Sequence, residues 1–286
     1  LLSFSVLSIG MYLFMSLHPY LWVYSIFAGL LFFYLSLSYF IGIFGGSFNL
    51  AQHLCKLEEG KDFYPTVDIF MPSCGEDIEI IRNTLVHVSF LEWPSDKIKY
   101  YVLDDSKDES HNAKLKGIAD ELGFTYISRP NKGELKKAGN IRNAFAQTSG
   151  EFFLILDADF APRPDFLKET IPYMIDEKVA IVQTPQYFSI MDDPWIQKGA
   201  AYIQELFYRL VQVNRQKWNA AICVGTCALY RRSALEPHGG TAAIGFSEDV
   251  HTGFQAICDG YKIQYIPINL SKGVCPDTTQ AFLVQQ

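Results

Sequence analysis

Residues 152–156 form an unbroken apolar run that leads directly into Asp157-Ala158-Asp159. An apolar run of this length without polar alternation is typical of a strand buried on both faces, as in a parallel sheet. In open α/β sheets, ligands bind outside the carboxyl ends of the strands, where these two carboxylates would lie. Because Mg²⁺ commonly takes one or two carboxylates plus substrate phosphates, the motif predicts a metal–diphosphate site. A simple turn is the alternative, since aspartate is common after strands.

Apolar runs and helical periodicities alternate through the middle of the chain. Strands are expected at 67–71, 98–103, 124–127, 152–156 and 179–183, and helices at 78–88, 113–122, 136–147 and 166–175. Strands that alternate with helices predict a parallel sheet with right-handed crossovers, and hence an α/β fold.

A second pair of carboxylates, Asp104 and Asp105, follows the expected strand at 98–103. Because parallel strands end at the same edge of a sheet, we expect this pair to converge with Asp157 and Asp159. Convergent carboxylates repel one another unless a cation or substrate donors compensate their charge. The two pairs together therefore favour a bound metal–nucleotide over a passive surface.

Three later features have more than one interpretation. Residues 194–213 have amphipathic spacing, typical of a helix that either covers the core or lies on a bilayer surface. Gly225 would let the backbone approach a ligand closely, or it serves only a turn. Ser247 is expected to cap a helix over 248–258, whose first turn would then contain two acids, either for simple capping or for function.

No charged residue precedes Lys56, and the chain before it is almost entirely apolar. We expect two membrane helices within 1–46, because helices of soluble cores normally carry a polar stripe. The second, at 20–44, is long enough to span a hydrocarbon core of about 30 Å, whereas the first is short, as if the chain began inside it. A signal peptide and a buried core hairpin are the alternatives. A linker over 47–64 and a globular α/β domain over 65–286 would follow.

Charge and cysteine content narrow the function classes. The net charge is −7, which argues against a nucleic-acid partner because such proteins usually present a basic surface. The six cysteines include no Cys-x-x-Cys pair and no matching zinc-ligand set. We expect them to be reduced and mostly buried, as in a cytosolic domain.

Seven short motifs occur in a fixed order along the chain. They are Leu103-Asp104-Asp105, Lys137-Ala138-Gly139-Asn140, Asp157-Ala158-Asp159, Gln183-Thr184-Pro185-Gln186, Gly225-Thr226, Ser247-Glu248-Asp249 and Gln285-Gln286. In this order they resemble the motifs of processive membrane glycosyltransferases of family 2, and most closely those of cellulose synthase catalytic subunits. The resemblance implies a glycosyltransferase domain of the Rossmann-like GT-A fold, facing the cytosol from the plasma or inner membrane.

The resemblance also implies roles on the donor side of the site. Asp104 and Asp105 would contact the uracil and ribose of UDP, and Lys137 would contact the diphosphate. Asp157 and Asp159 would bind Mg²⁺ or Mn²⁺ together with the sugar diphosphate. Family members often have histidine after this metal motif, but this chain has Phe160, so no third ligand is expected there.

On the acceptor side, the resemblance makes Asp249 the general base. Ser247 stands where the family's Thr-Glu-Asp motif has threonine. The chain stops before the Arg and Trp of the family's Gln-x-x-Arg-Trp motif, which implies a fragment. The remaining positions expected to bind substrate are Gly225, Thr226, Glu248 and Gln285.

The expected activity is inverting, metal-dependent transfer of glucose from UDP-glucose to the non-reducing end of a growing β-glucan. Its partners would be the UDP-sugar, the polysaccharide acceptor, the lipid bilayer and other synthase subunits. Two alternatives stay open: another processive product (mixed-linkage β-glucan, mannan, chitin or hyaluronan), and a catalytically silent scaffold subunit.

Overall fold

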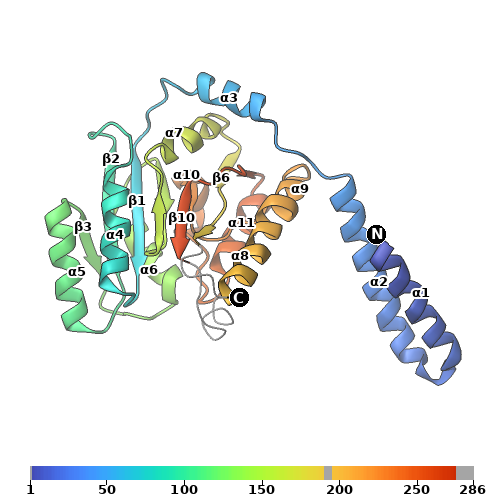
Figure 1. Ribbon diagram of the computed structural model, residues 1–286. Helices are drawn as coiled ribbons and strands as arrows, with labels where there is room; N and C mark the ends of the chain where they lie inside the picture. Colours follow the sequence, from blue (N-terminus) through green and yellow to red (C-terminus); the bar gives the residue numbers. More distant parts are fainter. Residues whose placement is uncertain (1, 190–194, 275–286) are drawn as a thin grey trace. The chain divides into compact units, whose positions relative to one another are not determined.

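The computed structural model describes residues 2–189 and 195–274, which fall into two compact units, Leu1–Ser47 and Phe48–Gln286. In the first unit, helices α1 (Leu2–Leu17) and α2 (Trp22–Ile43) are joined by the 3₁₀ turn η1 (Pro19–Leu21) and pack against each other (Figure 1). Of the described helices, only α2 is long and apolar enough to cross a membrane, over Trp22–Gly42. The expectation of two spanning helices is therefore supported for one of them.

A seven-stranded sheet forms the centre of the second unit, in the order β3-β2-β1-β4-β8-β6-β9. Its strands are β1 (Val67–Ser73), β2 (Ile98–Asp104), β3 (Thr125–Ser128), β4 (Phe152–Ile155), β6 (Val179–Gln183), β8 (Ala228–Arg231) and β9 (Lys262–Tyr265). All of them run parallel except β8, which is antiparallel to both β4 and β6. A smaller sheet has the order β5-β10-β7, from β5 (Phe160–Pro162), β10 (Ser271–Val274) and β7 (Tyr187–Ser189).

Helices cover both faces of the large sheet (Figure 1). Alternate residues of a strand point to opposite faces, so Ile69 joins one hydrophobic cluster and Phe70 the other. The first cluster packs under α4 (Ile78–Ser89), α5 (Glu109–Leu122) and α7 (Phe166–Thr170). The second packs under α6 (Lys136–Phe145) and α11 (Glu248–Cys258). The strands β1, β4, β6 and β8 at the centre of the sheet are buried on both faces, whereas β2, β3 and β9 include exposed residues.

A buried ion pair ties the reversed strand into the sheet. Arg232, at the start of α10 (Arg232–Leu235), lies 3.0 Å from Asp68 of β1 and also donates to the carbonyl oxygens of Gly150 and Phe145. The 3₁₀ turn η4 (Glu236–His238) follows.

The segment expected as a linker, 47–64, contains the helix α3 (Leu50–Glu59). Its His53 is 2% exposed and lies 2.7 Å from both the Tyr173 hydroxyl and the Glu169 carboxylate. These contacts hold α3 against the α/β domain, so part of the segment is ordered secondary structure.

Three local predictions need correction. The helix expected at 166–175 ends as α7 at Thr170 and continues as the 3₁₀ helix η2 (Ile171–Ile175), because Pro172 cannot donate a helical hydrogen bond. The helix expected at 194–213 comprises α8 (Trp195–Leu206), the π-helix η3 (Phe207–Gln212) and α9 (Val213–Gln216). The expectation that the cysteines are mostly buried is wrong: the five within the described residues are free, but Cys55, Cys74 and Cys258 are exposed and only Cys223 and Cys227 are buried.

Candidate active site

The sheet register brings the ends of four strands to one edge. Asp104, the last residue of β2, pairs with Ser73, the last residue of β1. Ile155, the last residue of β4, pairs with Ala228, the first residue of β8. Because β8 runs the other way, the loop before it reaches the same edge that the parallel strands leave. The acidic motifs therefore lie along one rim together with Gly225 and Thr226.

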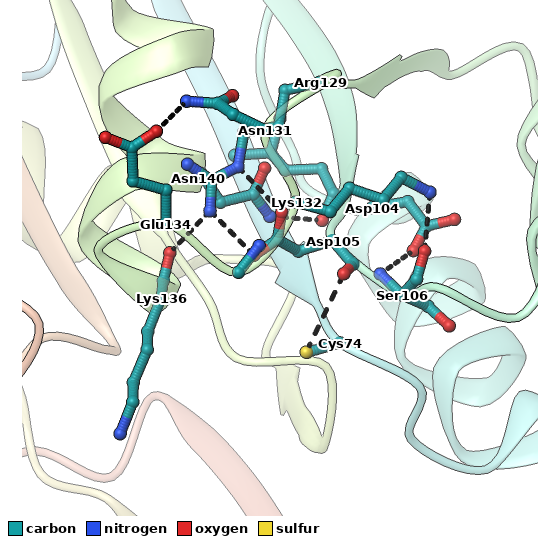
Figure 2. A network of polar contacts seen from close by, with 12 residues as sticks. Cys74, Asp104, Asp105, Ser106, Arg129, Asn131, Lys132, Glu134, Lys136 and Asn140 are labelled. Carbon is teal, nitrogen blue, oxygen red and sulfur yellow. Dashed lines mark hydrogen bonds and ion pairs between the residues drawn. The ribbon is translucent and has the colours of Figure 1, made fainter.

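Asp104 and Asp105, at the end of β2, are buried and hydrogen-bonded within the protein (Figure 2). Asp104 accepts hydrogen bonds from the Ser106 amide at 2.9 Å and the Tyr126 hydroxyl at 2.5 Å. Asp105 accepts two hydrogen bonds of 2.7 Å from the guanidinium of Arg129. Such bidentate pairs are strong and directional. The pair fixes the loop at this corner of the rim.

Lys137 occupies the centre of the rim. Its ammonium forms an ion pair with Asp157 and donates to the Gly225 carbonyl oxygen at 3.0 Å. The Asp157 amide in turn donates to the Thr226 hydroxyl at 2.8 Å. Burial alone would lower the pKa of Lys137, but the charge of Asp157, and beyond it that of Glu248, raises that pKa above its ordinary value. The ammonium therefore stays charged where an anionic group would bind.

Asp159 has no such basic partner at hydrogen-bond distance among the described residues. Burial, and then the like charge of Asp157, raise the pKa of Asp159 to about 6, and Glu76 adds to the effect. A backbone hydrogen bond and the charge of Lys137 oppose this shift only in part, so a bound cation would favour the charged form of Asp159. No cluster of three or more His, Cys, Asp or Glu side chains in the described ranges forms a complete metal site. Asp157 and Asp159 would offer a hard divalent ion two carboxylates, and such an ion would take its remaining oxygens from substrate and water.

The first turn of α11 adds two acids to the rim. A Cβ placed on Gly225 would lie 2.9 Å from the Asp249 Cβ, so the Asp249 side chain packs directly against this glycine. Burial raises the pKa of Glu248, although Lys137 opposes the shift. The prediction that Ser247 caps α11 is wrong. It stands at the N-cap position with φ 51°, and its side chain makes no capping hydrogen bond.

The Glycosyl transferase family 2 model matches residues 68–239 of this chain. The chain belongs to glycosyl transferase family 2. It is 31% identical over 252 residues to a cellulose synthase catalytic subunit [UDP-forming] of Xanthomonas axonopodis pv. citri, which covers 86% of this chain and 34% of the relative. It is 35% identical over 226 residues to cellulose synthase 1 of Komagataeibacter xylinus, with coverage of 77% and 14%. The chain thus spans about a third or less of the length of these relatives. The prediction that it is a cellulose synthase-like member of family 2 is confirmed.

Solved structures of glycosyltransferases share the fold. A mannosyltransferase from Pyrobaculum calidifontis, in complex with GDP-Man and Mn²⁺, has a TM-score of 0.63 at 19% identity, covering 82% of this chain and 67% of its own. Glucosyl-3-phosphoglycerate synthase from Mycobacterium tuberculosis, in complex with Mn²⁺ and UDP, has a TM-score of 0.52 at 15% identity, with coverage of 80% and 77%. These likenesses show the predicted GT-A fold.

Within this family 2 domain, the structure brings most of the predicted positions to one rim. Lys137, Asp157, Gly225 and Thr226 are linked by direct contacts. The buried carboxylates of Asp104 and Asp105 lie at the end of β2, and Gln285 falls outside the described residues.

Two residues of the rim were not predicted from the sequence. Arg129 pairs with Asp105, and Glu76 accepts hydrogen bonds from the Cys74 amide and the Ser73 hydroxyl while its charge acts on Asp159. Arg129 directly follows the last residue of β3, and Glu76 lies three residues after the last residue of β1. Their positions after strand ends are the sequence signal that could have predicted them.

Proposed function

We propose that the protein transfers glucose from UDP-glucose to the non-reducing end of a growing β-glucan, with inversion at the anomeric carbon. The observation that carries the proposal is the position of Lys137, whose ammonium contacts Asp157 on one side and the Gly225 carbonyl on the other. Since Asp249 packs against Gly225, a cation suited to a diphosphate lies next to a carboxylate suited to an acceptor hydroxyl. Similarity to cellulose synthase catalytic subunits named as UDP-forming supports the donor and the product class.

The chemistry needs two things from these side chains. Negative charge builds on the leaving UDP as the sugar–phosphate bond breaks. The Lys137 side chain is 28% exposed, and its ammonium is held in place to stabilise that charge. The acceptor hydroxyl becomes nucleophilic when Asp249 takes its proton, a contribution of about 10²–10⁴-fold. One base and one displacement invert the anomeric centre, so no nucleophilic side chain is required.

The remaining donor-side residues complete the proposed site. Asp157 and Asp159 would hold Mg²⁺ or Mn²⁺, which when bound would stabilise charge on the diphosphate oxygens. Asp104 and Asp105 would order the loop on the uracil and ribose side. Thr226 and Glu248 would border the transferred sugar.

The helix α8 and the segment η3 support a position at the membrane surface. Their inward side includes the small or polar Ala200, Ala201 and Gln212, all buried. Their outward side carries large apolar residues that are at least half exposed, namely Trp195, Tyr202, Ile203, Leu206 and Leu210. An apolar face turned outward is typical of helices that lie in a bilayer interface. We therefore propose that this face contacts lipid, as expected for an integral membrane protein whose catalytic domain is cytosolic.

The base assignment is tested with Asp249→Asn in the intact membrane protein. Transfer, measured as UDP release, should fall by about 10²–10⁴-fold, while UDP binding in the presence of Mn²⁺, measured by calorimetry, should persist. Asp120→Asn on the exposed side of α5 is the matched control and should change neither quantity. An equal loss of UDP affinity in Asp249→Asn would mean that this carboxylate only holds the nucleotide site together.

Product and donor are tested separately. Incubation with UDP-glucose, other UDP-sugars and GDP-mannose, followed by linkage analysis, should yield a β-glucan from UDP-glucose alone. A mannan, chitin or hyaluronan product would replace the proposed donor. No heat on adding UDP with Mn²⁺ or Mg²⁺ would indicate a silent scaffold subunit.

A further inference from the structure

Two turns of the chain meet beside Asp249 through a contact that the proposed chemistry leaves unused. Lys136 directly precedes Lys137 in the chain, and Phe246 lies three residues before Asp249. The Lys136 ammonium lies 3.5 Å from the centroid of the Phe246 ring. Figure 2 shows the Lys136 side chain pointing away from the polar network around Asp105. Its charge is therefore directed to the Phe246 ring, not to the nucleotide corner.

Backbone strain flanks this contact on both sides. Leu135 and Lys136 have φ values of 54° and 49°, and Ser247 has a φ of 51°. A residue with a Cβ in the left-handed region costs about 1–2 kcal/mol. Such conformations persist only where the surroundings impose them, and they cluster at functional sites. Both turns are thus held in conformations that fix the positions of Lys136 and Phe246.

The Phe246 ring is also unusually open to solvent. It is 75% exposed, although Lys136 lies over one of its faces. The ring precedes the first turn of α11, in which Asp249 packs against Gly225. An exposed aromatic ring therefore stands on the base side of the rim, where an acceptor must present its hydroxyl.

We propose that Phe246 and Lys136 form an acceptor platform, in which the exposed part of the ring stacks on the apolar C–H face of the terminal hexose. The inference rests on the proposed function, because it needs an acceptor hydroxyl delivered to Asp249. The ligand class is a neutral β-linked hexose chain, whose equatorial hydroxyls leave flat apolar faces on each ring. Lys136 keeps the phenyl ring in one orientation through the cation–π contact and donates hydrogen bonds to sugar hydroxyls at its edge.

The test measures cellotriose binding to the intact protein in nanodiscs, with UDP and Mn²⁺ present, by saturation-transfer NMR. Phe246→Leu keeps the apolar volume and removes the aromatic face, and should weaken cellotriose binding by roughly tenfold. Phe246→Trp retains a stacking surface and should bind within about twofold of the parent. UDP affinity should be unchanged in both variants, and in UDP-release assays the loss should appear in the acceptor KM before kcat.

Phe90→Leu is the matched control. Phe90 is 61% exposed and caps α4, a helix that returns from the rim to the opposite edge of the sheet. It should leave cellotriose binding unchanged. Equal binding by Phe246→Leu and the parent, or equal losses in the Leu and Trp variants, would overturn the platform. A parent protein that binds UDP but no cellotriose would also overturn it while leaving the donor site intact, whereas absence of UDP binding would instead refute the proposed function.

Discussion

Gly225→Ala is the sharpest probe of the contact between Gly225 and Asp249. Gly225 has a φ of 75°, a conformation that costs an alanine about 1–2 kcal/mol. At about 2–4 °C per kcal/mol for a domain of this size, the melting temperature should fall by about 2–8 °C. The new Cβ would also lie 2.9 Å from the Asp249 Cβ and 3.1 Å from its Oδ2.

The steric clash at Gly225→Ala should also slow the transfer reaction. Ordinary carbon–carbon contact requires about 3.5 Å, so the Asp249 side chain must retreat by about 0.6 Å. Since a misplacement of about 1 Å can cost on the order of 10²-fold in rate, UDP release during transfer should fall by at least about tenfold. UDP binding in the presence of Mn²⁺ should fall far less, because Lys137 donates to the backbone oxygen of Gly225 and not to a side chain.

Gly123→Ala separates the two effects. Gly123 ends α5 with a φ of 72°, and a Cβ built on it meets no atom within 4 Å. This variant should therefore show a similar drop in melting temperature and full transfer activity. If Gly225→Ala transfers sugar as fast as Gly123→Ala, then the position of Asp249 does not limit the reaction, and its assignment as the base fails.

Two further predictions concern the acidic side of the rim. Arg129→Met leaves the Asp105 carboxylate buried without its ion-pair partner and should lower the free energy of unfolding by about 3–5 kcal/mol in urea titrations. Arg82→Met breaks an exposed ion pair and should lower it by about 1 kcal/mol or less. Similar losses in the two variants would contradict the importance of burial. Because the pKa of Asp159 is raised to about 6, its carboxylate is charged above that pH and neutral below it, so Mn²⁺ affinity measured by calorimetry should fall as pH drops from about 7 to 5. Asp159→Asn should bind Mn²⁺ weakly with little pH dependence over that range, and a parent affinity that is flat with pH would argue against Asp159 as a ligand.

The parallel part of the sheet could be predicted because burial on both faces leaves an unbroken apolar run. Within β4, every residue from Phe152 to Ile155 is at most 1% exposed, and no polar position interrupts the pattern. The convergence of the motifs followed from the same logic, since parallel strands must end at one edge. The roles proposed for Lys137 and Asp249 came only from the order of the family motifs, because no local pattern indicates them.

Other features depend on contacts between distant residues. The direction of β8 is not encoded in its four residues, because an apolar strand fits a sheet in either direction. Arg129 and Asp105 are 24 positions apart, so their pairing follows only from how β2 and β3 end. On α8, the periodicity placed Ala200 and Ile203 on one apolar face, but the structure buries Ala200 and leaves Ile203 half exposed. The packed side accepts Ala200 and Ala201, which allow close approach to the domain, and leaves Ile203 and Leu206 outside.

The reversal of β8 brings a late part of the chain to the edge at which the early strands end. The residues proposed to bind the nucleotide diphosphate all precede Phe160, whereas Gly225, Phe246 and Asp249 all follow β6 in the chain. A chimera that exchanges the chain after β6 should therefore alter mainly the acceptor side, provided that it keeps the Lys137–Gly225 and Asp157–Thr226 hydrogen bonds across the join.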